Sequence, residues 1–136
     1  MNISSFDQLL RAARQQPEPQ RLLFVFARAE LPEDATPADI ERFKAGRGGA
    51  LAPVMFVDKR CDEIDSLAQL VAESRHTGQA WDLVFAGCLG GLGGREPGDD
   101  ETQAALELMV KSIQGGSVSH LLAYRENGEQ LSFAAN

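Results

Sequence analysis

Five basic residues each follow an apolar segment of the sequence that is expected to form a strand. These residues are Arg28, Lys59, Arg60, Arg95 and Arg125. In an open α/β sheet, ligands bind outside the carboxyl ends of the strands. Parallel strands would therefore bring the five cations to one edge, where they would suit a small anionic ligand. The alternative is an ordinary solvated edge, because Glu30, Asp58 and Glu126 lie close by in the sequence and could neutralise the cluster.

A glycine-rich segment, residues 87–95, lies between an apolar run and an expected helix. Its candidate ligand-binding residues are Gly90, Gly91, Gly93, Gly94 and Arg95. Glycines let backbone amides approach a ligand closely, and the N-terminal end of a helix favours anions. However, no phosphate-binding fingerprint is present, and the helix opens with acids that would repel a phosphate. The alternative is a mobile surface loop.

Cys88, in the same segment, is the one candidate catalytic residue, as a nucleophile or a redox thiol. A base would have to be His76 or His120, but parallel strands would place His120 at the opposite end of the sheet. Cys61 could approach Cys88 at the carboxyl edge as a redox partner, although no C-x-x-C motif is present. The scattered cysteines and histidines predict no metal site, and no cofactor motif is found.

The elements that would position these residues follow from hydrophobic periodicity and turn signals. The expected order is helix, strand, helix, strand, helix, strand, helix and two final strands. The run 22–27 is apolar without alternation, which is typical of a strand covered on both faces. Pro53 lies near the start of the second strand or marks that strand as an edge. Asn127-Gly128 predicts a hairpin that joins strands 118–124 and 130–133.

Strands that alternate with helices predict parallel crossovers. The expected fold is an α/β three-layer α-β-α sandwich. Its mixed five-stranded sheet would be mostly parallel, with a C-terminal antiparallel hairpin.

Composition limits the class of protein. The chain has 136 residues, of which 43% are hydrophobic and 24% charged, and its net charge is −7. This predicts a single α/β domain over residues 1–136. The acidic balance argues against nucleic acid or an anionic membrane as the partner. Because no export signal or long apolar stretch is evident, we expect a cytoplasmic protein.

Residues 1–26, 53–59 and 81–85 resemble a family of short bacterial proteins that often carry the label "ribonucleotide reductase subunit alpha". The resemblance covers nearly the whole chain. A true catalytic subunit of that kind needs a far larger barrel domain, more cysteines and a pair of radical-transfer tyrosines. This chain has two cysteines and one tyrosine, Tyr124. The resemblance therefore implies a small soluble bacterial protein and supplies no catalytic residue.

Three functional hypotheses follow. The first is a non-enzymatic binding or regulatory module that recognises a protein partner or a small anionic ligand at the carboxyl edge of the sheet. The second is a homodimeric structural or interaction protein, which would pair through the edge strand that carries Leu131 and Phe133. The third is an enzyme that uses Cys88.

Overall fold

The computed structural model of the chain describes residues 5–30, 34, 36–44 and 50–131. Their elements follow the expected order of helices and strands. They are α1 (Phe6–Arg14), β1 (Gln20–Glu30), α2 (Pro37–Lys44), β2 (Ala50–Arg60), α3 (Leu67–Arg75), β3 (Leu83–Gly90), α4 (Asp99–Gln114), β4 (Leu122–Tyr124) and β5 (Gln130–Leu131).

The prediction of a mostly parallel sheet is wrong, because every pair of neighbouring strands is antiparallel. The five strands are arranged in the order β2-β1-β3-β4-β5. β1 pairs with both β2 and β3, and β4 pairs with β3 and β5. The fold is therefore not a mostly parallel sheet in a three-layer sandwich, although its final two strands do form the antiparallel pair that Asn127-Gly128 predicts.

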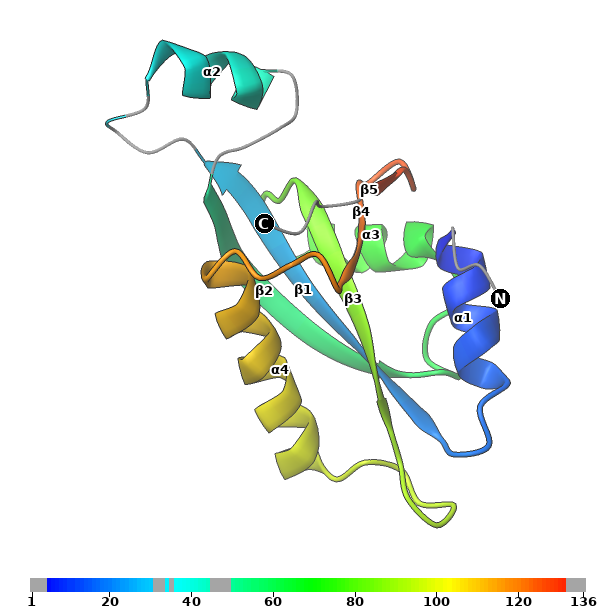
Figure 1. The fold of residues 1–136 in the computed structure, drawn as a ribbon. Helices are drawn as coiled ribbons and strands as arrows, with labels where there is room; N and C mark the ends of the chain where they lie inside the picture. The colour runs from blue at the N-terminus through cyan, green and yellow to red at the C-terminus, as the bar shows by residue number, and fades with distance from the viewer. Residues whose placement is uncertain (1–4, 31–33, 35, 45–49, 132–136) are drawn as a thin grey trace.

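For β1 and β2, the reason for the error lies in the connection between the two strands. A parallel crossover requires its helix to pack back onto the sheet. α2 instead lies beyond the ends of β1 and β2 (Figure 1), and Ile40 on its apolar face is 37% exposed. The connection therefore acts as a long hairpin loop that contains a helix, and β2 returns alongside β1 in the opposite direction.

β1 is an interior strand that is buried on both faces, as its continuous apolar run predicts. All six residues of the run 22–27 are buried. Leu22, Phe24 and Phe26 belong to one core cluster, while Leu23, Val25 and Ala27 belong to the other. Burial on both faces is thus achieved in an antiparallel sheet, because helices cover both sides of this strand.

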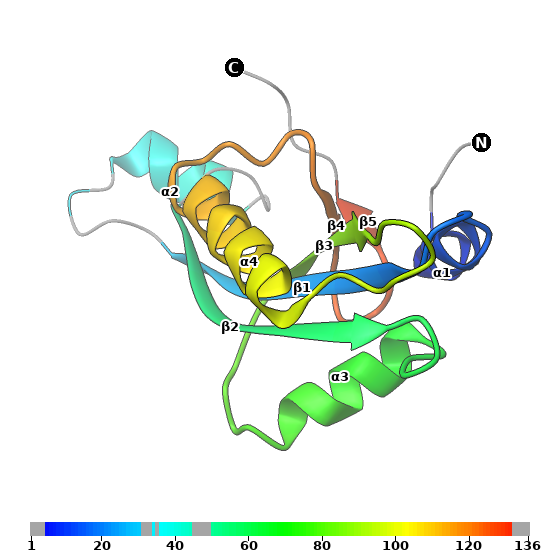
Figure 2. The ribbon, with the colours of Figure 1, turned by 90° about the horizontal axis from the view of Figure 1, so that it is seen from below.

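The helices divide between the two faces. α1 and α3 pack with Trp81 and Tyr124 on one face, and α4 packs on the other. Figure 2 shows α3 and α4 on opposite sides of β1 and β2. Because β2 and β3 both flank β1, α3 must connect two strands that are not neighbours. This topology leaves β2 at one edge of the sheet and the short β5 at the other.

Candidate functional site

The antiparallel sheet separates the five cations that were expected to converge. Lys59 and Arg60 end β2, opposite Leu22 and Arg21 at the start of β1. Arg28 lies at the other end of β1, opposite Ala52. Arg125 follows Tyr124, which pairs with Val84 near the start of β3, so it also lies toward the Arg28 end. The expected convergence is therefore wrong: only Lys59, Arg60 and the loop that carries Arg95 share an end of the sheet.

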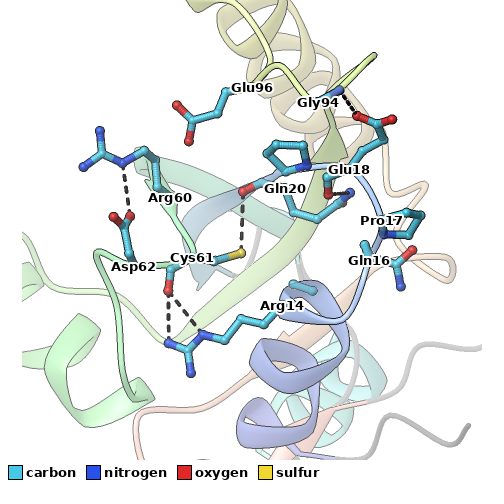
Figure 3. A pocket seen from close by; sticks show the side chains of 12 residues that line it. Arg14, Gln16, Pro17, Glu18, Gln20, Arg60, Cys61, Asp62, Gly94 and Glu96 are labelled. Carbon is cyan, nitrogen blue, oxygen red and sulfur yellow. Dashed lines mark hydrogen bonds and ion pairs between the residues drawn. The ribbon is translucent and has the colours of Figure 1, made fainter.

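The Arg60 end of the sheet contains an open pocket of about 410 Å³. Its walls are the α1–β1 turn, the residues at the end of β2 and the loop after β3 (Figure 3). The charged residues that line it are Arg14, Glu18, Arg60, Asp62 and Glu96. Acids therefore outnumber bases here, so the pocket does not present the reversal of charge that an anionic ligand would need.

Two of the predicted site cations at this end, Lys59 and Arg60, are already engaged by the protein. Arg60 Nε lies 3.1 Å from Asp62 and 3.7 Å from Glu63, and Asp62 raises the pKa of Arg60 above its ordinary value by a hydrogen bond and its charge. Lys59 Nζ lies 2.8 Å from a Glu73 carboxylate oxygen. An added anion would have to compete with these carboxylates.

The structure explains the glycine-rich segment by its backbone geometry. Leu92 and Arg95 exchange two backbone hydrogen bonds across a two-residue turn. Gly93 and Gly94 form that turn with φ of 62° and 79°, the left-handed region that such turns require. A Cβ atom on Gly91 would overlap the Arg95 carbonyl oxygen. These glycines therefore serve a tight turn and a close approach between backbones.

The amides of this segment largely donate within the protein. Gly91 N–H donates to the Pro19 carbonyl, and Gly94 N–H donates to the Glu18 carboxylate at 2.7 Å. The N–H groups of Leu92 and Arg95 are used in the turn itself. Ligand binding by Gly90–Arg95 stays a prediction, and most of the backbone N–H groups on which it depends already have acceptors.

The two cysteines are poorly suited to nucleophilic chemistry. Cys88 of β3 pairs with Leu22 of β1, and the residue as a whole is exposed to solvent. The protein atoms around its thiol nevertheless raise its pKa to about 11, and the nearby Cys61 adds to the shift. Partial burial likewise raises the pKa of Cys61. Both thiols are therefore protonated near neutral pH, whereas nucleophilic catalysis needs a thiolate.

The two thiols are also badly placed for a direct disulfide. Cys61 follows β2 and Cys88 lies in β3, and β1 runs between these strands. Two strand spacings amount to roughly 10 Å, beyond the ~7 Å that bridged Cα atoms allow. Neither thiol makes a hydrogen bond to an imidazole among the described residues, and no group of three His, Cys, Asp or Glu side chains there is placed to hold a metal.

β2 forms a second candidate site that the sequence analysis did not identify. Its 11 residues make it a long edge strand, and in the described part of the chain it pairs with β1 alone. A groove of about 240 Å³ runs between β2 and α3. Its apolar lining includes Phe26, Met55, Val57 and Leu70, with Lys59 and Glu73 also lining it. Phe56, on β2 itself, is 48% exposed.

Only one sequence signal pointed to this site. Pro53 lacks a backbone N–H, which is why its presence favours an edge strand, and β2 is indeed at the edge. The apolar run 51–57 concealed the exposure of Phe56, because hydrophobic pattern alone does not show which strand lacks a second neighbour.

Comparisons with protein-family models, with curated proteins and with solved structures find no match for this chain. The resemblance to the short bacterial family therefore stays an expectation. None of the described helices combines the length and apolar character that a membrane crossing requires.

Proposed function

We propose that the protein is a non-enzymatic binding module that recognises a protein partner by adding an extended segment of that partner to the edge of β2. The observation that carries this proposal is the open edge of β2 beside the α3 groove. Edge strands present unpaired N–H and C=O groups, and a peptide that pairs with them gains backbone hydrogen bonds.

The sequence of β2 supports this use of the edge. Proteins protect edge strands with proline and charged residues. In β2 such residues stand near the two ends, Pro53 on one side and Asp58–Arg60 on the other. The intervening residues Val54–Val57 are all apolar. A register shift leaves Val54 without a partner residue in β1, so the regular and unprotected part of the strand that is open to pairing is Met55–Val57.

The groove supplies a place for side chains of the added segment. In a strand, alternate side chains point to opposite faces. One set from the partner would enter the groove between β2 and α3, and the other set would pack near Phe56 on the opposite face of β2. The groove is smaller than the roughly 300–1,000 Å³ of typical small-molecule sites, and its size suits amino-acid side chains better than a cofactor.

A protein partner is better supported than a small anionic ligand. Lys59 and Arg60, two of the three predicted site cations at the pocket end of the sheet, are paired with acids, and the pocket beside them has more acids than bases. The hypothesis of an enzyme that uses Cys88 has the least support, because the Cys88 thiol has a raised pKa.

The proposal is tested with a set of three nine-residue peptides. Each carries valine at every second position, and the positions between the valines are lysine in one peptide, serine in another and glutamate in the third. Amide chemical shifts and hydrogen exchange would be measured by NMR at up to about 1 mM peptide, which detects weak binding. We expect shifts at Val54–Val57 and along α3, with slower exchange of β2 amides. If no peptide of the set binds, or the shifts lie elsewhere, the proposal is wrong.

Phe56→Lys provides the matched variant. A lysine at an edge blocks strand addition, so we expect peptide affinity to fall about tenfold or more. Leu108→Lys on α4 is the control, because Leu108 is 66% exposed and takes the same added charge away from the groove. Thermal unfolding should show both variants folded, as is usual for exposed substitutions. Equal loss of binding in both variants would contradict a site at β2.

A further inference from the structure

The charge around the β2 edge indicates what kind of segment it accepts. Four acidic residues lie between the end of β2 and the end of α3 in the sequence. Their side chains are partly or largely exposed: Asp62 75%, Glu63 42%, Asp65 91% and Glu73 44%. Lys59, by contrast, is 18% exposed and ion-paired with Glu73. The most exposed of these charged side chains are therefore carboxylates.

The cations beside these acids offer little to an acidic partner. Arg60 already faces both Asp62 and Glu63. Arg14 contacts Asp65 at 3.6 Å but also donates to the carbonyls of Cys61 and Ile64. Arg75, at the end of α3, is the one further cation of this stretch. Carboxylates can accept several donors at once, so Asp62 and Asp65 can receive a cation from outside without losing their own partners.

The whole chain reinforces this local preference. Its net charge is −7. Two copies of the chain would meet as like charges, which opposes association, whereas a basic segment would be attracted and steered toward the edge. Charge therefore disfavours a second copy as the occupant of β2 and favours a basic partner.

We infer that the β2 edge binds an extended, net-basic segment of another protein, with apolar residues at every second position and lysine or arginine between them. This inference rests on the proposed function and adds the chemistry of the partner. The apolar side chains would fill the groove against Met55, Val57 and Leu70. The segment would continue past Arg60, and its basic side chains would meet the exposed carboxylates of Asp62 and Asp65 in the β2–α3 connection.

The test compares the lysine peptide with the glutamate peptide of the set described above. The two peptides have valine at the same positions and differ only in the residues between the valines. Fluorescence anisotropy of the labelled peptides would give both affinities. In dilute buffer we expect the lysine peptide to bind about tenfold or more tightly than the glutamate peptide. Near 1 M salt the ratio should fall toward one, since the screening length shrinks to about 3 Å.

A pair of charge-matched variants locates the effect. Asp62→Asn with Asp65→Asn should reduce the preference for the lysine peptide roughly three- to fivefold. Glu107→Gln with Glu126→Gln changes the net charge equally at exposed positions on α4 and in the β4–β5 turn, and it should leave the preference within about twofold. Equal losses in the two variants would overturn the assignment to these carboxylates.

The remaining outcomes separate this inference from the proposed function. If both peptides bind equally and shift the β2 amides, the basic partner is wrong while strand addition at β2 stands. If neither peptide binds, and no other peptide of the set does, both fail. If light scattering shows a dimer and the outward β2 amides are already protected without peptide, a second copy occupies the edge and the basic partner is wrong.

Discussion

At the scale of single residues, the chemistry open to Cys88 depends on the state of its thiol. Its side chain lies on the same face of the sheet as Leu22, and the surrounding protein atoms raise its pKa to about 11. Cys61 increases that shift, because a second negative charge would be unfavourable nearby. No basic residue lowers the pKa of Cys88, so its strand position by itself does not make it a nucleophile.

This state predicts slow alkylation of Cys88. A free thiol has a pKa of about 8.5, so at pH 7 the thiolate fraction of Cys88 should be on the order of a hundredfold smaller. We expect Cys61→Ser protein to react with iodoacetamide far more slowly than free cysteine at pH 7. The rate should rise about tenfold for each pH unit up to pH 10. Alkylation as fast as that of free cysteine near neutral pH would revive the enzyme hypothesis.

At the scale of elements, Arg14 joins α1 to the connection between β2 and α3, two parts of the fold that lie far apart in sequence. It stands in the last turn of α1 and donates to the Cys61 carbonyl at 3.0 Å and to the Ile64 carbonyl at 2.7 Å. These carbonyls belong to the connection from β2 to α3. Arg14 thereby helps to hold α3 beside β2. Because β2 and α3 form the two walls of the proposed groove, Arg14 helps to keep those walls in place without lining the groove itself.

Arg14→Ala should therefore lower the free energy of unfolding by about 1–2 kcal/mol, because the carbonyls lose charged donors. Arg11→Ala is the control. Arg11 is exposed in the same last helical turn and makes the same favourable interaction with the helix dipole, so its loss should cost about 0.5 kcal/mol or less. Urea unfolding of the two variants measures the difference. Equal destabilisation would show that the dipole interaction, rather than the contact with the β2–α3 connection, is what matters.

At the scale of the whole molecule, the two cores meet at the central strands, and Tyr124 is completely buried in the core beneath α1. Its ring packs edge-on against Phe6, with ring centres 5.5 Å apart. The hydroxyl has no hydrogen-bond partner among the described residues. Burial, together with the nearby Cys88, raises the pKa of Tyr124 to about 12.

This raised pKa predicts that the fold loses stability at alkaline pH. The unfolded tyrosine releases its proton near pH 10 and the folded one near 12, so between these values the unfolded state binds fewer protons and the free energy of unfolding falls as pH rises. Urea unfolding from pH 8 to 11.5 measures the decline.

Tyr124→Phe is the matched variant for that experiment. It removes a buried hydroxyl without a protein partner, so at pH 7 it should change stability by less than about 1 kcal/mol. Above pH 10 its stability should decline less steeply than that of the parent protein. Identical alkaline slopes for the two proteins would contradict the raised pKa of Tyr124.

Much of the fold was predictable because its signals are local. The continuous apolar run 22–27 predicted a strand buried on both faces, and β1 is such a strand. Asn127-Gly128 predicted the final hairpin, which has Gly128 at φ 89°. Phe133, which was expected in its last strand, lies outside the described residues.

The candidate site was less predictable, since its parts depend on strand direction. The expected cation cluster required parallel strands, and antiparallel pairing places Arg28 and Arg60 at opposite ends of β1 and β2. The glycines after β3 were recognised as unusual, but their role in a tight turn depends on contacts with Arg95 and Pro19. Phe56 was missed because its exposure follows from the position of β2 in the sheet.

The amino-acid sequence by itself determined the order of helices and strands, because periodicity, caps and turn residues act over a few neighbouring positions. Tertiary structure alone decided the direction of the strands, since that depends on the path that each connection takes around the sheet. α2 covers no face of the sheet and β2 folds back beside β1, whereas α4 does cover a face and β4 still pairs antiparallel with β3. Within the described part of the chain, this arrangement leaves one side of β2 without a partner strand, and that side is the edge on which the proposed function depends.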